Sequence, residues 1–123
     1  MRTAGPRDTS ERLHHVGTGD LAGTLDIHGP ERHMMLSIGH DALKDGVLLG
    51  RYARCDGTAD DPSLSRVHTL LLHEDDRLLA IDTASSNGTS VADEDKARVI
   101  EIGADTVLKL GKSTRATWRW SAG

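Results

Sequence analysis

Apolar and polar residues alternate in short runs along most of this chain, which is the pattern of half-buried β-strands. In the first half, residues 23–28 and 32–38 form two such runs with a Gly-Pro turn between them, and they predict a first hairpin. Residues 47–49 predict a short buried strand. Residues 39–46 fit either a short helical turn or a loop.

The second half continues the alternation. Residues 67–73 and 78–81 predict a second hairpin around a charged turn. Further strands are predicted at residues 89–91, 98–102, 106–110 and 114–120. In the last of these, Ala116, Trp118 and Trp120 fall on one face. No helical period longer than two turns occurs, so the pattern predicts an all-β fold, an antiparallel β-sandwich or barrel.

Two segments lack this alternation. Residues 1–20 are polar and rich in glycine, and they predict a flexible N-terminal arm ahead of a β-domain at residues 21–123. Thr3, Thr9 and Thr18 of the arm are candidate phosphoacceptors, one of which could bind a second copy of the chain. Residues 52–64, with many Asp, Gly and Pro residues, predict a long loop.

Composition narrows the class of protein. The 123 residues favour one domain, and the net charge of -4 makes the chain a poor nucleic-acid binder. Cys55 is the only cysteine, which excludes an internal disulfide, fits a reducing compartment and makes packing its simplest role. No apolar run is long enough to span a membrane, and the N-terminus has no hydrophobic signal core. We therefore expect a soluble cytoplasmic protein with no membrane partner.

Three polar clusters stand where predicted strands start or stop. The first is Gly50-Arg51, the second runs from Ser65 to His68, and the third runs from Ser85 to Thr89. Together they supply two guanidinium groups, several hydroxyls and an amide, which suit the binding of an oxyanion such as phosphate.

The first cluster follows a buried strand. Gly50 allows a close backbone approach, and the forked guanidinium of Arg51 suits bidentate contact with phosphate. The alternative for Arg51 is an ion pair with an acidic residue of the next loop. Those residues are Asp56, Asp60 and Asp61.

The other two clusters add hydroxyls, a second cation and a turn. Ser65 can donate its hydroxyl to an anion, with Arg66 beside it, and His68 is best explained as an orienting residue hydrogen-bonded to loop backbone. Asn87-Gly88 reverses the chain readily through positive φ. One interpretation of the third cluster is a plain hairpin turn. The other is a binding site, in which Ser86 contacts a phosphate and the Asn87 amide holds a peptide backbone.

Catalysis and metal binding find less support. Ser65, His68 and Asp82 are the residue types of a nucleophilic triad, but no strained Gly-x-Ser-x-Gly turn is present. The seven histidines do not form a ligand-spaced group with Cys55 or a carboxylate. We expect no enzyme activity, no cofactor and no metal.

The ordered combination of Gly50-Arg51, Ser65-x-x-His68 and Asn87-Gly88 resembles the signature of the forkhead-associated (FHA) domain family. The resemblance is strongest from Val47 to Val91 and extends more weakly from Leu25 to Trp120. It implies a β-sandwich of about eleven short strands that binds phosphothreonine peptides through loops at one end.

Carried over by motif position, the resemblance assigns a role to each residue. Arg51 and Ser65 would contact the phosphate, with Arg66 and Ser86 as secondary contacts, and Asn87 would hold the ligand backbone. Gly50, His68 and Gly88 would shape the site. The implied partner is a phosphothreonine-containing protein segment, the substrate of a Ser/Thr kinase, and the alternative is a scaffold of the same fold that binds partners without phosphate.

Two features depart from the family pattern. After the Asn-Gly-Thr turn, where the family often has a second Asn-Gly, this chain has Ala92-Asp93-Glu94-Asp95, and we interpret residues 92–96 as a charged, solvated turn. Three aspartates, at positions 56, 60 and 61, also crowd the loop after Arg51. We expect these aspartates to repel acidic ligand residues, or to select basic ones, beside the phosphothreonine.

Overall fold

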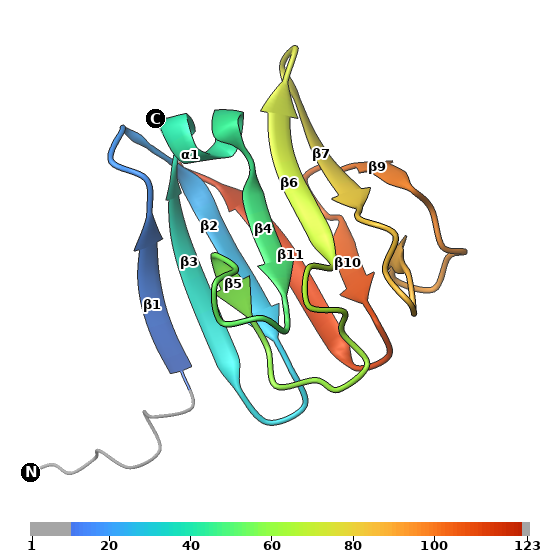
Figure 1. Ribbon diagram of the computed structural model, residues 1–123. Helices are drawn as coiled ribbons and strands as arrows, with labels where there is room; N and C mark the ends of the chain where they lie inside the picture. The colour runs from blue at the N-terminus through green and yellow to red at the C-terminus, as the bar shows by residue number, and fades with distance from the viewer. Residues whose placement is uncertain (1–10, 122–123) are drawn as a thin grey trace, which may run out of the picture.

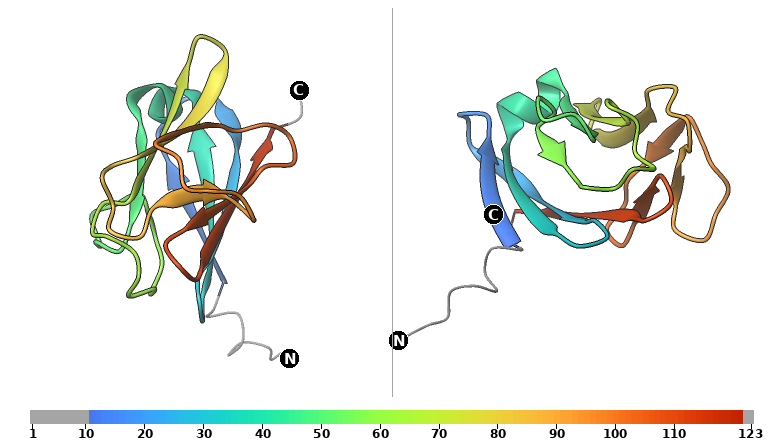
Figure 2. Two further views of the ribbon diagram at one scale, coloured as in Figure 1. Left: turned by 90° about the vertical axis from the view of Figure 1, so that its right-hand side faces the viewer. Right: turned by 60° about the horizontal axis from the view of Figure 1, so that its bottom comes forward.

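The computed structural model describes residues 11–121. Within that range the chain forms eleven β-strands and one short α-helix. The strands lie in two sheets that pack face to face (Figure 1 and Figure 2). The fold is therefore the β-sandwich of about eleven short strands that the resemblance implied.

One sheet has six strands in the order β1-β3-β2-β11-β10-β8. Their bounds are β1 Glu11–Val16, β2 Leu21–His28, β3 His33–Gly39, β8 Thr89–Val91, β10 Val107–Leu110 and β11 Thr114–Trp120. The predicted first hairpin is β2 with β3, in which Leu25 lies opposite Leu36. β1 pairs with β3 in parallel, so this sheet is mixed at one edge.

The other sheet has five strands in the order β5-β4-β6-β7-β9. Their bounds are β4 Val47–Gly50, β5 Gly57–Thr58, β6 Thr69–Glu74, β7 Arg77–Asp82 and β9 Val99–Glu101. The predicted second hairpin is β6 with β7. β5 pairs with β4 in parallel, so this sheet is also mixed at one edge.

The core lies between the two sheets and is built from aliphatic side chains and one tryptophan. Alternate residues of the central strands point into it, as the alternation predicted. Its fully buried members include Leu25, Leu36, Ile38, Leu43, Val47, Leu49, Leu71, Leu78, Leu108 and Leu110. Ala116 and Trp118 of β11 are buried as well, but Trp120 at the end of that strand remains 42% exposed.

Two segments differ from the sequence-based expectation, and a third decides between two alternatives that the sequence left open. Residues 11–16 form β1, so the prediction of a flexible arm is wrong for that part, while residues 1–10, with Thr3 and Thr9, lie outside the described residues. Residues 40–45 form the helix α1, His40–Asp45, where either a helical turn or a loop was expected. The predicted loop at 52–64 contains the two-residue strand β5.

The connection between β1 and β2 is fixed by one carboxylate of α1. Asp41 accepts hydrogen bonds from the backbone N–H groups of Thr18 (2.9 Å) and Gly19 (3.0 Å), and from the Thr18 hydroxyl (3.2 Å). The two backbone hydrogen bonds hold the pKa of Asp41 at about 2. Thr18 therefore already has an anionic partner, which argues against its role as a phosphoacceptor.

The two ends of the sandwich differ in chemistry. α1 and the β6–β7 turn lie at the upper end in Figure 1. At the lower end β4 stops, β6 and β8 begin, and β7 stops. All three polar clusters predicted from the sequence flank these strand ends, so the fold gathers them at one end.

Candidate functional site

The first polar cluster is joined to the second through the backbone. The Arg51 N–H donates to the Ser65 carbonyl and the Tyr52 N–H donates to the Arg66 carbonyl, both at 3.0 Å. A Cβ added to Gly50 would lie 2.3 Å from the Arg66 carbonyl oxygen, so only glycine permits this approach. Gly50 thus brings the two segments together, as its expected shaping role requires.

Arg51 presents its guanidinium at the surface while one nitrogen anchors it. Its Nε donates to the Leu64 carbonyl at 3.0 Å, and the residue is exposed. Among the described residues, no carboxylate lies within ion-pair distance of Arg51. The alternative of an ion pair with Asp56, Asp60 or Asp61 is therefore wrong, and the two terminal nitrogens keep their hydrogens for another acceptor.

His68 connects the second cluster to the third. Its side chain is fully buried, its Nδ1 accepts the Ser65 N–H at 3.0 Å, and its Nε2 lies 2.8 Å from the Gly88 carbonyl. Because a carbonyl only accepts, the proton must be on Nε2, which defines the neutral tautomer. The expected hydrogen bonds to loop backbone are therefore present.

Ser65 and Ser86 meet directly. The Ser86 N–H donates to the Ser65 Oγ at 3.0 Å, which leaves the Ser65 hydroxyl hydrogen available. Neither nitrogen of His68 faces Ser65 Oγ, and Asp82 is not among the hydrogen-bond partners of His68. The Ser65, His68 and Asp82 side chains therefore do not form the proton relay of a nucleophilic triad.

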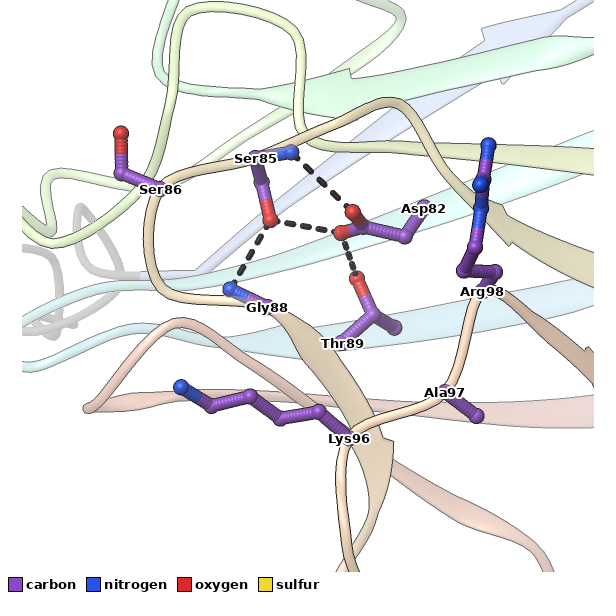
Figure 3. Close-up of a pocket in the computed structure, with 8 residues that line it drawn as sticks. All are labelled: Asp82, Ser85, Ser86, Gly88, Thr89, Lys96, Ala97 and Arg98. Atoms are coloured by element: carbon purple, nitrogen blue, oxygen red, sulfur yellow. Dashed lines mark hydrogen bonds between the residues drawn. The ribbon is translucent and has the colours of Figure 1, made fainter.

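The third cluster is organised by Asp82, a role that sequence reasoning missed. Its carboxylate accepts the Ser85 hydroxyl at 2.6 Å, the Ser85 N–H at 3.0 Å and the Thr89 hydroxyl at 2.8 Å (Figure 3). Burial raises the pKa of Asp82, but the Ser85 and Thr89 hydrogen bonds outweigh it and hold the pKa below its ordinary value. The Ser85 hydroxyl in turn accepts the Gly88 N–H at 2.9 Å, and Gly88 has φ of 86°, as the turn prediction required.

Asn87 is held by a residue that the sequence did not single out. Its amide Nδ2 donates to the Ser63 carbonyl at 2.8 Å. The Ser63 hydroxyl also accepts the Lys112 N–H at 2.7 Å, which brings in the β10–β11 turn. The side-chain carbonyl oxygen of Asn87 and the second hydrogen of its amide stay available to hold a ligand backbone.

Asp61 is the buried anchor of this arrangement. It is 1% exposed, and it accepts the Ser63 N–H (2.8 Å), the Ser63 hydroxyl (2.7 Å), the Ser113 N–H (3.1 Å) and the Thr114 hydroxyl (2.8 Å). Burial raises the pKa of Asp61, and the hydrogen bonds from Ser63 and Thr114 bring it below its ordinary value.

The expectation that the loop aspartates face a ligand is wrong for Asp61, because its carboxylate points into the protein. Asp56, although exposed, accepts the Leu48 N–H at 2.9 Å, and Asp60 is exposed. Asp61 and Asp56 therefore hold the loop and its neighbours in place.

Arg66 lies at the surface beside the second cluster. Its side chain is exposed, and its carbonyl accepts the Tyr52 N–H and the Cys55 thiol at 3.2 Å. Burial, with the nearby charge of Asp56, raises the pKa of the Cys55 thiol, which agrees with the packing role expected for it. We name the surface formed by Arg51, Ser65, Arg66, Ser86 and Asn87 the polar loop cluster.

A cavity of about 260 Å³ lies beside the polar loop cluster (Figure 3). One wall comes from the loop at residues 82–89 and the other from Lys96, Ala97 and Arg98. Ser86 belongs to both the cavity wall and the polar loop cluster. Sequence reasoning had placed Lys96 in a solvated turn and gave no role to Arg98.

No group of three or more His, Cys, Asp or Glu side chains within residues 11–121 is arranged to hold a metal ion. No helix within the described residues is long and apolar enough to cross a membrane.

The chain belongs to the FHA domain family, because the family model matches residues 47–111, more than half of its length. No curated protein sequence matches the chain. The matched segment runs from β4 to the end of β10 and contains every residue of the polar loop cluster.

Solved structures agree on the fold. FHA-1 of Mycobacterium tuberculosis Rv1747 is 22% identical, with a TM-score of 0.62 over 82% of this chain and 99% of that one. A domain from a structural and functional analysis of phosphothreonine-dependent FHA domain interactions is also 22% identical, with a TM-score of 0.64 over 83% and 99%. Mycobacterium tuberculosis EmbR, in complex with a low-affinity phosphopeptide, is 22% identical, with a TM-score of 0.62 over 81% of this chain and 25% of EmbR. Phosphothreonine-dependent interaction is thus found within this family.

Proposed function

We propose that this protein is a non-catalytic module that binds phosphothreonine-containing protein segments, the products of a Ser/Thr kinase, in phosphorylation-dependent signalling. The single observation that carries the proposal is the convergence of Arg51, Ser65 and Ser86 at one end of the sandwich. The Ser86 N–H meets the Ser65 Oγ at 3.0 Å, and the Arg51 side chain is anchored by Nε alone.

A phosphate dianion needs several donors that converge without a competing carboxylate. It brings about -1.5 to -2 charge and three acceptor oxygens. In the polar loop cluster, Arg51 contributes two terminal guanidinium nitrogens, and Ser65 contributes a hydroxyl hydrogen. The two carboxylates nearest in the network, Asp61 and Asp82, are engaged by hydroxyl and backbone donors.

Each residue takes a distinct role in this proposal. Arg51 and Ser65 bind the phosphate, Arg66 and Ser86 add secondary contacts, and Asn87 uses its carbonyl oxygen and second amide hydrogen on the ligand backbone. Gly50, His68 and Gly88 keep the three segments in register. The free, buried Cys55 thiol fits a reducing compartment such as the cytoplasm.

The proposal is tested by offering the immobilised chain two matched peptide libraries. One has a central phosphothreonine and the other an unmodified threonine at the same position, with the flanking positions randomised. We expect retention of phosphorylated peptides only. Equal retention of the two libraries would instead identify a scaffold that binds partners without phosphate.

A further inference from the structure

The cavity beside the polar loop cluster carries positive charge on one wall. Lys96 and Arg98 line it, and no carboxylate among the described residues lies within ion-pair distance of either. This local excess of cations stands out in a chain whose net charge is -4. The acidic residues Asp93, Glu94 and Asp95 precede Lys96 but do not line the cavity.

The carboxylate in the cavity wall does not cancel these cations. Both oxygens of Asp82 accept hydrogen bonds, from the Ser85 hydroxyl, the Ser85 N–H and the Thr89 hydroxyl. In Figure 3 these bonds turn the Asp82 carboxylate toward its own loop. These neutral donors stabilise the carboxylate but do not remove its charge, so an incoming anion would meet two cations, Lys96 and Arg98, against the single carboxylate of Asp82.

The backbone that carries the two cations is pinned on both sides. The Ala97 N–H donates to the Thr89 carbonyl at 2.9 Å, and the Arg98 carbonyl accepts the Asp82 N–H at 2.8 Å. Lys96 forms a β-bridge with Ser90. Lys96 and Arg98 thus extend from fixed positions, so a ligand does not have to order the backbone beneath them.

The stem of Lys96 is positioned by Gly88. A Cβ at Gly88 would lie 2.5 Å from Cδ and 2.8 Å from Cγ of Lys96, so the absence of a side chain leaves the groove in which this stem lies. Gly88 therefore has two roles: its φ of 86° closes the turn, and its missing side chain makes room for the cation.

Ser86 places the cavity within reach of the same ligand. Its N–H is bonded to the Ser65 Oγ of the polar loop cluster, and the residue also lines the cavity. An extended peptide advances by about 3.3 Å per residue. A peptide that binds its phosphothreonine at Arg51 and Ser65 and crosses the turn at residues 85–88 would bring a neighbouring side chain to Lys96 and Arg98.

We propose that this cavity is a second anion subsite, which selects phosphothreonine peptides that carry an acidic side chain near the phosphothreonine. This inference rests on the proposed function of the polar loop cluster. The shared chemistry is a negatively charged group on the peptide, and its source is either the carboxylate of Asp or Glu or a second phosphate. Peptides with neutral or basic residues at that position bind through the polar loop cluster alone.

The test uses synthetic phosphothreonine peptides in a neutral Ala-Gly-Ser background. Glu, a second phosphothreonine or Gln is placed in turn at each flanking position, and the dissociation constant is measured by fluorescence anisotropy at low and at physiological salt. At one flanking position we expect Glu to bind about two- to fivefold more tightly than Gln, the range for a partly exposed ion pair. The second phosphate carries a larger charge than Glu. Tighter binding of the doubly phosphorylated peptide than of the Glu peptide identifies phosphate as the preferred occupant, and this gain in affinity should fall more steeply as salt is added.

Charge-neutral variants locate the effect. In the double variant Lys96→Gln with Arg98→Gln, the preference for Glu over Gln should fall to about one, while the affinity for the all-neutral phosphothreonine peptide stays that of the unmutated chain. Lys44→Gln is the matched control, since Lys44 is an exposed cation of α1 at the opposite end of the sandwich. It should keep the full preference.

The outcomes separate this inference from the proposed function. If the unmutated chain binds phosphothreonine peptides but shows no preference for an acidic residue at any position, or if the double variant keeps that preference, the subsite is refuted and the proposed function stands. If the unmutated chain does not distinguish phosphorylated from unmodified threonine peptides, both are refuted. The comparison of peptides on the unmutated chain requires no variant to fold.

Discussion

His68 provides the sharpest test of how the site is held together, because its ring spans two of the three polar clusters. The His68→Ala variant removes a fully buried ring and two hydrogen bonds, to the Ser65 N–H and to the Gly88 carbonyl. Emptying a large buried site costs about 2–5 kcal/mol, and each hydrogen bond contributes about 0.5–1.5 kcal/mol.

These terms overlap, and we expect His68→Ala to lower the free energy of unfolding by about 3–5 kcal/mol. For a domain of this size that corresponds to a fall of about 10–25 °C in melting temperature. Small domains are stable by about 5–15 kcal/mol, so the variant should remain folded at low temperature. Thermal and urea unfolding followed by circular dichroism measure both quantities.

Two conservative variants separate the two hydrogen bonds. In His68→Asn the side-chain oxygen replaces Nδ1 and can accept the Ser65 N–H, whereas in His68→Gln the amide nitrogen replaces Nε2 and can donate to Gly88. The Gly88 carbonyl also accepts the Gly111 N–H at 3.0 Å, but His68 is the only partner found for the Ser65 N–H among the described residues. His68→Asn should therefore keep phosphopeptide affinity better than His68→Gln.

Either of two results would contradict this role of His68. One is a melting temperature of His68→Ala within about 3 °C of the unmutated chain, which corresponds to less than about 1 kcal/mol. The other is an equal loss of affinity in the Asn and Gln variants, which would mean that the Ser65 contact does not orient the phosphate site.

Three further predictions address the anchors around the site. Asp61→Asn should lower the free energy of unfolding at neutral pH by about 2–4 kcal/mol, since hydrogen bonds to a charged group are each worth about 1.5–3 kcal/mol and Asn recovers part of them. The folded-state pKa of Asp61 is lowered, so the stabilisation from its charge is fully present above the ordinary value of 3.8 and is lost as pH falls through the folded-state pKa. The free energy of unfolding of Asp61→Asn, measured with urea, should therefore depend less on pH in that acid range. A pH profile equal to that of the unmutated chain would contradict this role of Asp61. Asn87→Ala should weaken phosphopeptides of every flanking sequence by a similar factor in an anisotropy titration, and a loss confined to some sequences would argue against a backbone contact. Asp41→Asn should speed amide hydrogen exchange at Thr18 and Gly19 with little change in phosphopeptide affinity, whereas unchanged exchange would show that Asp41 does not hold this connection.

The parts of the fold that bury alternate residues could be predicted from the sequence, and the parts that bury little could not. Both hairpins, β2–β3 and β6–β7, follow from alternation with a core on one side. β1 gives no such signal because it is an edge strand whose Leu13 is 58% exposed, and its hydrogen bonds come from β3. α1 has six residues and one buried side chain, Leu43, which is too little for a helical period.

The same division holds within the site. Gly50, His68 and Gly88 were identified because their residue types stand at strand ends where turns and orienting bonds are needed. The anchoring role of Asp61 was missed because its partners Ser113 and Thr114 lie more than 50 positions away in the sequence. Lys96 was missed because its position depends on the space that Gly88 leaves, which only the folded chain shows.

One titration shows whether Arg51 and Ser65 bind a phosphate. The affinity of the chain for a single threonine peptide is measured in its phosphorylated and unmodified forms, for the unmutated chain and for Arg51→Ala. We expect binding of the phosphorylated form only, and a loss of about 2–5 kcal/mol of binding free energy in Arg51→Ala at an unchanged melting temperature. Equal affinity of Arg51→Ala and the unmutated chain for the phosphorylated peptide would contradict the phosphate-binding role of Arg51.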